Sequence, residues 1–205
     1  MPDIHEERPL LYADWIASGR LYAPIEEHMR NVAGPYVANT HTETTLMGTT
    51  MTRAYHTARE KIKSHVNANC NDYLFLTGNG MTSAVNKLQR ILGLRIPESL
   101  KDIIPEQERP VVLLTHMEHH SNQITWEECN VDIRIIPPDY ETGLPDLEEL
   151  EKMAQKYSSK PMLIGAFTAG SNVTGILTPY HEMSKIIHRY GGKCFIDFAA
   201  SAPYT

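Results

Sequence analysis

Short hydrophobic runs recur along the chain from residue 73 onward, each followed by a longer stretch of mixed polarity. Runs rich in Val, Ile, Leu and Phe are typical of parallel strands that are buried on both faces. The predicted strands are Tyr73–Thr77, Val111–Thr115, Val131–Ile136, Met162–Thr168 and the run that begins at Lys193 and ends at Asp197.

Between these runs, hydrophobic residues recur at spacings of three and four, which places them on one face of a helix. The clearest case follows Gly78-Asn79-Gly80 and includes Met81, Val85, Leu88 and Leu92. The other helices predicted here are Ser121–Cys129, Leu147–Tyr157 and a helix from Tyr180 to Tyr190 with Pro179 in its first turn. This alternation predicts an α/β fold with an open, mostly parallel sheet and helices on both faces.

The first part of the chain has weaker periodicity. We expect a short extended stretch and turn over Tyr12–Arg20, a helix near Ala23–Val32 and a loop at Asn39–Thr45, then a helix from about Thr50 to Val66. Closely spaced prolines and glutamates predict a surface insertion at residues 96–110. We therefore predict an N-terminal arm and helix over residues 1–50 and a larger domain over residues 51–205.

Composition narrows the functional classes. The net charge of −6 and the lack of a Lys/Arg cluster argue against nucleic acid as a partner. No stretch reaches the roughly 20 apolar residues of a membrane span, and the charged stretch Met1–Arg8 lacks the apolar segment of a signal peptide. The cysteines, Cys70, Cys129 and Cys194, are odd in number and far apart, which predicts free thiols in a reducing, cytosolic compartment.

The turn at Gly78–Gly80 is the first candidate site. A helix N-terminus carries free N–H groups and partial positive charge, so the turn with Gly80, Met81 and Thr82 could hold a phosphate. The match to a dinucleotide fingerprint fails at the third glycine, and no Walker lysine follows. An ordinary strand-to-helix turn is the alternative.

The run His116-Met117-Glu118-His119-His120 follows the second predicted strand. Its spacing differs from the zinc motif HExxH, and no other cluster supplies the missing ligands, so we predict no metal site. A histidine at the end of a strand could stack on a flat ligand or transfer protons. A polar loop is the alternative.

Asn172 and Asp197 each follow or end a further predicted strand. By itself, each has an ordinary explanation, a turn for Asn172 and a helix cap for Asp197. The carboxyl ends of parallel strands share one edge of the sheet, which is where such sheets bind ligands. A phosphate-bearing aromatic cofactor with a ring nitrogen would use the phosphate turn, the histidine, the amide and the acid together.

These residues resemble those of the class V aminotransferase group of pyridoxal-phosphate (PLP) enzymes, which includes cysteine desulfurases and selenocysteine lyases. The resemblance runs from about Tyr12 to Pro203 in matching order, and it covers only the amino-terminal part of that group's chain. Its most specific parts are the run Met117–Asn122 with Trp126 and the run Ser171–Gly175.

The resemblance implies a role for each candidate residue. His119 would be the catalytic residue that stacks on the PLP ring, Asn172 would bond the ring's phenolic oxygen, and Asp197 would hold the ring nitrogen. Gly80, Met81 and Thr82 would bind the phosphate, and His41 would lie on the substrate side. The implied substrate is an amino acid, and the complete protein would be a homodimer.

The departures from the family are specific. Ala200 stands where many relatives have a glutamine. The lysine that forms the Schiff base lies in a Ser-x-His-Lys stretch in the family, and none of the nine lysines here has that context. In the family, two later strands separate the Tyr73–Thr77 strand from the strand of Asp197, and neither is present. We therefore expect a partial PLP domain with bare strand edges that binds PLP weakly or not at all.

Two alternatives remain open. The chain could be a non-catalytic truncated product, or a module that pairs with another chain through the open sheet. It could also be a Rossmann-type oxidoreductase, but that fold needs an acid at a strand end roughly 20 residues after the glycines, and Lys101 and Asp102 lie in the predicted insertion instead.

Overall fold

A computed structural model describes residues 9–202 and 204, so the charged stretch Met1–Arg8 lies outside the described residues. The chain forms two compact units that divide between Phe75 and Leu76. Each unit is described by itself below. The domain boundary expected at residue 50 stays a prediction.

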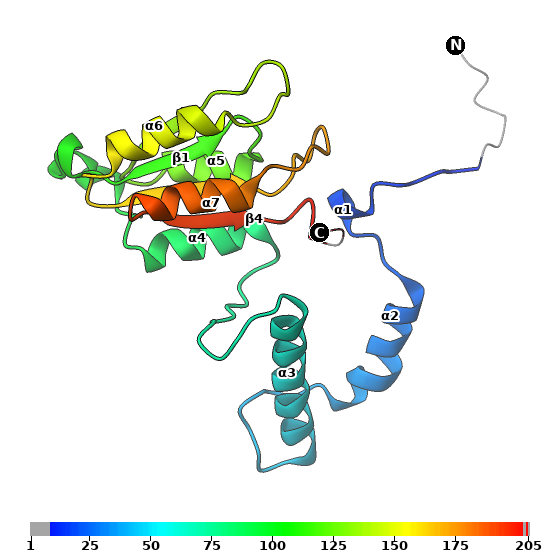
Figure 1. Ribbon diagram of the computed structural model, residues 1–205. Coiled ribbons are helices and arrows are strands. Elements are labelled where there is room, and N and C mark those ends of the chain that lie inside the picture. The colour runs from blue at the N-terminus through cyan, green and yellow to red at the C-terminus, as the bar shows by residue number, and fades with distance from the viewer. Residues whose placement is uncertain (1–8, 203, 205) are drawn as a thin grey trace. The chain divides into compact units, whose positions relative to one another are not determined.

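The second unit contains a four-stranded parallel sheet with the strand order β2-β1-β3-β4. Strands β1 and β4 of this sheet are labelled in Figure 1. Its strands are β1 (Val111–Thr115), β2 (Asp132–Ile136), β3 (Leu163–Thr168) and β4 (Lys193–Asp197). Every neighbouring pair runs parallel, and Thr168 at the end of β3 lies opposite Asp197 at the end of β4. The carboxyl ends of all four strands therefore share one edge, as the sequence predicted.

Helices cover both faces of this sheet, which confirms the predicted fold class. The helices are α4 (Met81–Ile91), α5 (His120–Glu127), α6 (Leu147–Tyr157) and α7 (Tyr180–Arg189). Alternate residues of the central strands point to opposite faces. Val112, Leu114 and Ile164 pack with Val85 of α4 and Trp126 of α5. On the other face, Val111, Leu113 and Phe167 pack with Leu150 of α6 and Ile187 of α7.

The predicted insertion between α4 and β1 contains two short 3-10 helices, η3 (Glu98–Ile103) and η4 (Glu106–Glu108).

A polar side chain determines where helix α6 begins. Asp146 caps α6 by accepting hydrogen bonds from the backbone N–H groups of Glu148 and Glu149 at 2.9 and 3.0 Å. Capping of this kind satisfies the free donors of the first helical turn.

The first unit consists of helices. They are α1 (Trp15–Ser18), α2 (Ala23–His28), a π-helical turn η1 (Met29–Ala33), a 3-10 turn η2 (Gly34–Tyr36) and α3 (Leu46–His65). The stretch expected to be extended therefore contains the short helix α1, which Asp14 caps and Gly19 ends in a left-handed conformation. Helix α3 begins four residues earlier than predicted because the Thr45 side chain accepts a hydrogen bond from Gly48 N–H and caps it.

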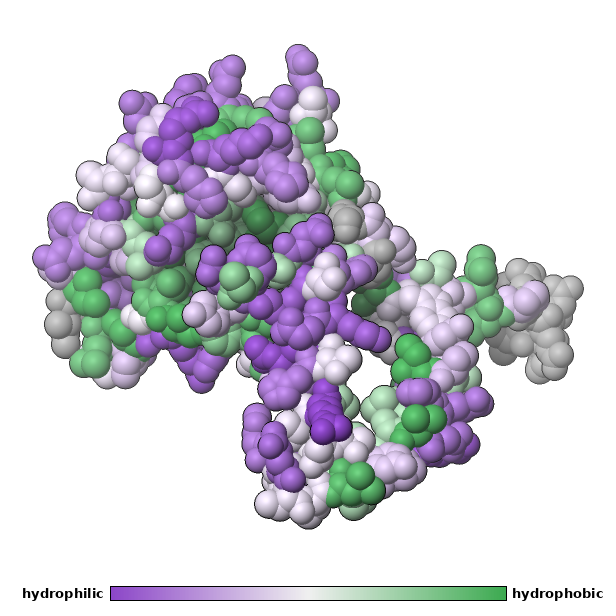
Figure 2. All heavy atoms as spheres, turned by 60° about the horizontal axis from the view of Figure 1, so that its bottom comes forward, coloured by the Kyte–Doolittle hydropathy of each residue, from purple (hydrophilic) through white to green (hydrophobic). Residues whose placement is uncertain are grey.

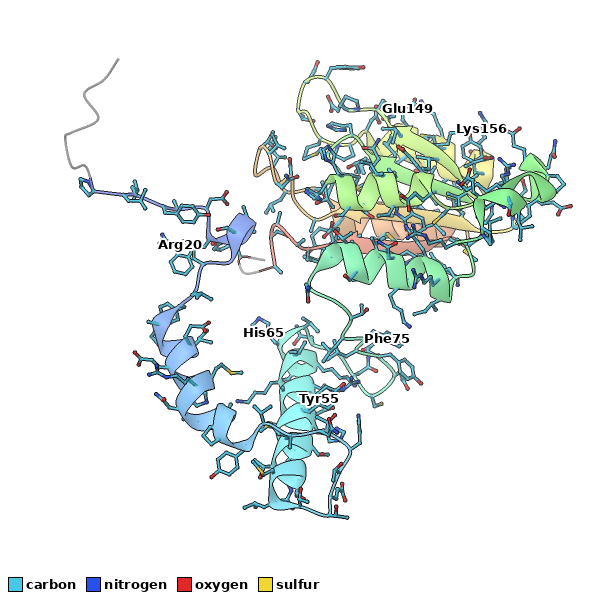
Figure 3. The ribbon with its side chains drawn as sticks, turned by 180° about the vertical axis from the view of Figure 1, so that it is seen from behind. Arg20, Tyr55, His65, Phe75, Glu149 and Lys156 are labelled. Carbon is cyan, nitrogen blue, oxygen red and sulfur yellow. The ribbon has the colours of Figure 1, made fainter. Side chains whose placement is uncertain are left out.

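The predicted strand Tyr73–Thr77 is wrong. Among the described residues, this segment has no strand neighbour, and Tyr73 and Phe75 are 85% and 63% exposed. Phe75 is labelled on this connection after α3 in Figure 3. An extended segment needs a neighbouring strand to satisfy its backbone hydrogen bonds. The composition of a strand is present here, but its partner strand is not.

Among the helices of residues 9–202, none combines the length and the apolar character that crossing a bilayer requires.

Candidate functional site

A cavity of about 400 Å³ lies in the second unit, among residues of α4, α5 and β4. Its lining is mostly hydrophobic and comprises Met81, Ala84, Val85, Leu88, Asn122, Trp126 and the run 194–198. The volume lies within the range of about 300–1,000 Å³ that is usual for small-molecule sites. Figure 2, turned to bring the lower side of Figure 1 forward, shows hydrophobic residues gathered on the exposed surface of this unit.

Asp197 is the residue with a carboxylate in the cavity lining. It ends β4 and is 4% exposed. Its Oδ1 accepts a hydrogen bond from the backbone N–H of Ala199 at 2.8 Å, and no described residue donates a hydrogen bond to Oδ2. Burial raises the pKa of Asp197, while the Ala199 hydrogen bond and the charge of His119 act in the opposite direction. A buried acid with an unused oxygen is suited to a cationic ring N–H.

His119 lies near Asp197, since its imidazole, when protonated, lowers the pKa of that carboxyl. It is the N-cap residue of α5, and its Nδ1 accepts a hydrogen bond from the backbone N–H of Ser121 at 3.2 Å. The hydroxyl of Ser121 is 2.8 Å from the same nitrogen. Since Nδ1 is an acceptor in this arrangement, the neutral ring carries its proton on Nε2. The ring is therefore held in one orientation and one tautomer.

The turn before α4 has the geometry expected of an anion site. Gly78 has a φ of +56°, and a Cβ at this position would lie 2.1 Å from Ser83 Oγ, so only glycine fits there. No described residue accepts a hydrogen bond from the backbone N–H of Met81 or Thr82. These donors lie at the start of an 11-residue helix, and Met81 lines the cavity. A phosphate at the mouth of the cavity would meet free N–H groups.

Asn172 lies in the loop that follows β3, at the same edge of the sheet, and is exposed. Ser171 shapes this loop, since its Oγ accepts hydrogen bonds from the backbone N–H groups of Val173 and Thr174. Among the described residues, no hydrogen bond joins Asn172 to Asp197, His119 or the α4 turn. Its place in the site stays a prediction.

His41 belongs to the first unit, so its position relative to the cavity is not defined. Its φ is +69°, which is uncommon for a residue other than glycine. Its backbone N–H donates to the hydroxyl of the buried Thr52 at 3.0 Å, and its ring meets that of Tyr55 edge-on (Tyr55 is labelled in Figure 3). The loop around His41 therefore has a defined local structure.

Glu118 is a residue of the site region that the sequence interpretation missed. Its carboxylate accepts four hydrogen bonds: two from Thr115, one from the backbone of Thr168 and one from the side chain of Asn122. Burial raises the pKa of Glu118, and these hydrogen bonds partly oppose that effect. The sequence pattern that could have indicated this role is the spacing of Glu118, which precedes Asn122 by four residues and Trp126 by eight.

Two kinds of chemical group are not found near this cavity in the described part of the chain. No lysine lines the cavity. No group of three His, Cys, Asp or Glu side chains among the described residues is arranged to hold a metal ion. The ring nitrogen Nε2 of His116 instead lies 3.1 Å from the backbone oxygen of Gly143.

The second unit is an α/β domain with a parallel sheet and a cavity of small-molecule size among α4, α5 and β4. The family model described as "Aminotransferase class-V" matches residues 11–204. The chain therefore belongs to the class V aminotransferase family.

Curated relatives match over nearly the whole of this chain. A probable cysteine desulfurase of Halalkalibacterium halodurans is 29% identical over 96% of this chain and 46% of its own length. A cysteine desulfurase of Synechococcus elongatus is 26% identical over 96% of this chain and 30% of its own length. The chain thus spans about half, or less, of the length of these relatives.

Solved structures share the fold at low identity. An apo cysteine desulfurase of Thermococcus onnurineus aligns with a TM-score of 0.68 at 21% identity over 90% of this chain and 42% of its own. The cysteine desulfurase CsdA of Escherichia coli aligns with a TM-score of 0.67 at 21% identity, over 92% of this chain and 45% of its own. These structures establish the architecture of the chain and nothing more.

Proposed function

We propose that this chain is most of the cofactor-binding part of a PLP-dependent enzyme that acts on an amino acid. The observation that carries the proposal is the buried carboxyl of Asp197, which ends a strand, lines a cavity next to the free N–H groups of α4 and lies near His119. The charges and donors at this site complement an aromatic ring with a basic nitrogen and a phosphate.

Each side chain would have a distinct task. Asp197 would keep the ring nitrogen protonated, and the N–H groups of Met81 and Thr82 behind Gly80 would bind the phosphate. The imidazole of His119 would stack on the ring face. Asn172 would donate to the ring oxygen, and His41 would face the substrate in the complete protein. PLP, when bound, supplies an electron sink that weakens the bonds at the substrate's α-carbon.

Attachment of the cofactor needs a residue that this stretch does not provide. Since no lysine among the described residues lines the cavity, the residues described here would hold the ring by non-covalent contacts alone. Transamination and sulfur removal from cysteine both fit such a site, and the similarity to cysteine desulfurases favours cysteine as substrate. A homodimer of the complete protein and a cytosolic location are further parts of the proposal.

A titration with pyridoxine 5′-phosphate tests the proposal. This compound has the ring and phosphate of PLP but no aldehyde, so it cannot react with surface lysines. In backbone NMR spectra of the 205-residue chain, we expect shifts at Met81–Ser83, His119 and Asp197, with a dissociation constant in the millimolar range. Asp197→Asn should weaken binding about tenfold or more, since a charge-assisted hydrogen bond is lost.

Asp139→Asn is the matched control, because Asp139 is not among the residues that line the cavity and the new amide can still accept the turn hydrogen bonds from Glu141 and Thr142. Shifts confined to other surfaces, or equal affinities for both variants, would overturn the proposed site. Stoichiometric attachment of PLP itself to a single lysine after borohydride treatment would contradict the argument about the missing lysine.

The free edge of β4 favours a second candidate, a non-catalytic module that pairs with another chain. Among the described strands, β4 pairs only with β3, and an unpaired edge can accept another strand. Reading the coding sequence beyond codon 205 separates the two candidates. An in-frame Ser-x-His-Lys supports the enzyme, and a stop codon with no such stretch supports the module.

A further inference from the structure

Glu118, Asn122 and Trp126 form a chain of hydrogen bonds in the wall of the cavity. The indole Nε1–H of the fully buried Trp126 donates to Asn122 Oδ1 at 3.2 Å. Asn122 Nδ2 then donates to Glu118 Oε2 at 2.7 Å. Asn122 and Trp126 both line the cavity.

The other carboxylate oxygen connects two strands. Glu118 Oε1 accepts the backbone N–H of Thr115 at 3.3 Å and its hydroxyl at 2.6 Å, at the end of β1. The same oxygen accepts the backbone N–H of Thr168 at 3.0 Å, at the end of β3 and 50 residues away in sequence. Glu118 thus connects the turn that carries His119 to the strand that leads to Asn172.

In the hydrogen bonds that join Trp126, Asn122 and Glu118, chemistry determines which group donates and which accepts. An indole N–H only donates, so Asn122 must accept with its oxygen and donate with its nitrogen. Backbone N–H groups also only donate. Both oxygens of residue 118 therefore have to accept, which an ionised glutamate does and a glutamine cannot do.

We propose that Glu118 is a positioning residue. Its four hydrogen bonds fix the turn that carries His119, and so the place of the His119 ring, relative to β3 and α5. The proposal rests on the proposed function, in which His119 stacks on the cofactor ring. Glu118 itself precedes His119 in the chain and touches the site only through the turn and through Asn122.

Glu118→Gln tests this with almost no change in size. If the new amide nitrogen faces Asn122, two donors meet, and turning the Asn122 amide only moves the conflict to Trp126. If it faces Thr168, it meets two backbone donors. We expect hydrogen exchange at the Thr168 amide or the Trp126 indole to accelerate about tenfold or more, the scale of one lost bond to a charged group. We also expect the His119 ring nitrogen resonances to shift and the affinity for pyridoxine 5′-phosphate to fall about tenfold.

A paired substitution provides the rescue. With Glu118→Gln and Asn122→Asp together, the glutamine oxygen accepts from Thr168 and Thr115, its nitrogen donates to the aspartate, and the aspartate accepts from Trp126. Every donor again meets an acceptor, and one negative charge remains. Exchange rates, His119 signals and affinity should return to within about twofold of the parent chain, a strongly non-additive result.

Glu127→Gln is the matched control, because Glu127 is an exposed acid on α5, the helix that carries Asn122 and Trp126. The indole signal of the exposed Trp15 serves as an internal reference in every spectrum. A merely structural role would lower the stability of Glu118→Gln but leave the His119 signals and the affinity of the folded chain unchanged, and that result would overturn the proposal. A double variant that behaves no better than Glu118→Gln, or that fails to fold, would also overturn it.

The two hypotheses fail in different ways. If the parent chain does not bind the ring probe, the proposed function fails, while the exchange rates and His119 signals still decide the role of Glu118. If the parent and Glu118→Gln bind the probe equally and show the same His119 signals, the role of Glu118 is refuted and the proposed function stands.

Discussion

Gly165 lies in the middle of β3, where the strand packs against α7. A Cβ at this position would lie 2.6 Å from Phe167 Cζ and 2.9 Å from Ile187 Cγ1, whereas ordinary contacts begin at 3.4 Å. Overpacking of a core by one carbon costs about 1–3 kcal/mol. The lower entropy of the unfolded alanine chain offsets about 0.4–1 kcal/mol of this. Gly165→Ala should therefore lower the free energy of unfolding by about 1–2 kcal/mol, measured by urea titration with far-UV circular dichroism.

Gly170→Ala is the matched comparison, two residues beyond the end of β3. There the nearest atom to a new Cβ is Leu177 Cδ2 at 3.0 Å, the end of an exposed and adjustable side chain. We expect no loss, or a gain of up to about 1 kcal/mol. Phe167→Leu removes the ring atoms nearest Gly165, so combining it with Gly165→Ala should cost less than the sum of the two. Equal losses for Gly165→Ala and Gly170→Ala, or a simply additive pair, would refute the packing argument.

Three further predictions concern ionisable groups and a helix cap. Burial raises the pKa of Asp197, so its ionised form destabilises the folded chain at neutral pH. Asp197→Asn should increase the free energy of unfolding at pH 7, and urea titrations should show that this gain vanishes below about pH 3.9, the usual pKa of aspartate. Burial raises the pKa of Cys129 to about 11 and also raises that of Cys194, so Ellman's reagent at pH 8 should label the exposed Cys70 first, the half-buried Cys194 more slowly and the buried Cys129 only after denaturation. Asp146→Ala removes the cap of α6 and should cost about 1 kcal/mol in the same urea assay, and an unchanged midpoint would contradict the capping role.

The sequence pattern predicted the central elements because local and tertiary preferences agree there. The residues of β1 and β3 are buried from end to end, as a continuous apolar run predicts for a strand covered on both faces. Helices α4, α6 and α7 each bury one face, and their hydrophobic spacing was visible before any contact was known. Agreement across these levels is what makes such elements predictable.

The segment Tyr73–Thr77 shows where this reasoning fails. Its residues favour a strand as those of β1 do, yet it has no strand neighbour in the part of the chain that the structure describes. Strand propensity mainly reflects packing against neighbouring strands and faces, so it cannot be realised by a segment alone. The local sequence pattern does not indicate whether a partner strand exists elsewhere in the fold.

The candidate site was predictable to the extent that topology determines it. Placing His119, Asn172 and Asp197 after successive parallel strands required only the rule that carboxyl ends share an edge. The role of Glu118 could not be predicted, because it depends on which of several acceptors faces which donor across β1, β3 and α5. Hydrogen-bond direction of this kind becomes visible only once the side chains are placed.

The spacing of Glu118, Asn122 and Trp126 has a physical explanation that does not involve a ligand. An indole can only donate, so the side chain four residues earlier must accept from it; Asn122 accepts with its amide oxygen and donates with its amide nitrogen. With an amide at residue 122, the side chain at residue 118 has to accept from both the amide and the strands, which a carboxylate does with its two oxygens. The constraint therefore applies to the order of donors and acceptors along these hydrogen bonds and not to any one residue. Glu118→Gln alone reverses one donor–acceptor pair and should destabilise the site more than Glu118→Gln combined with Asn122→Asp, which restores a match at every bond.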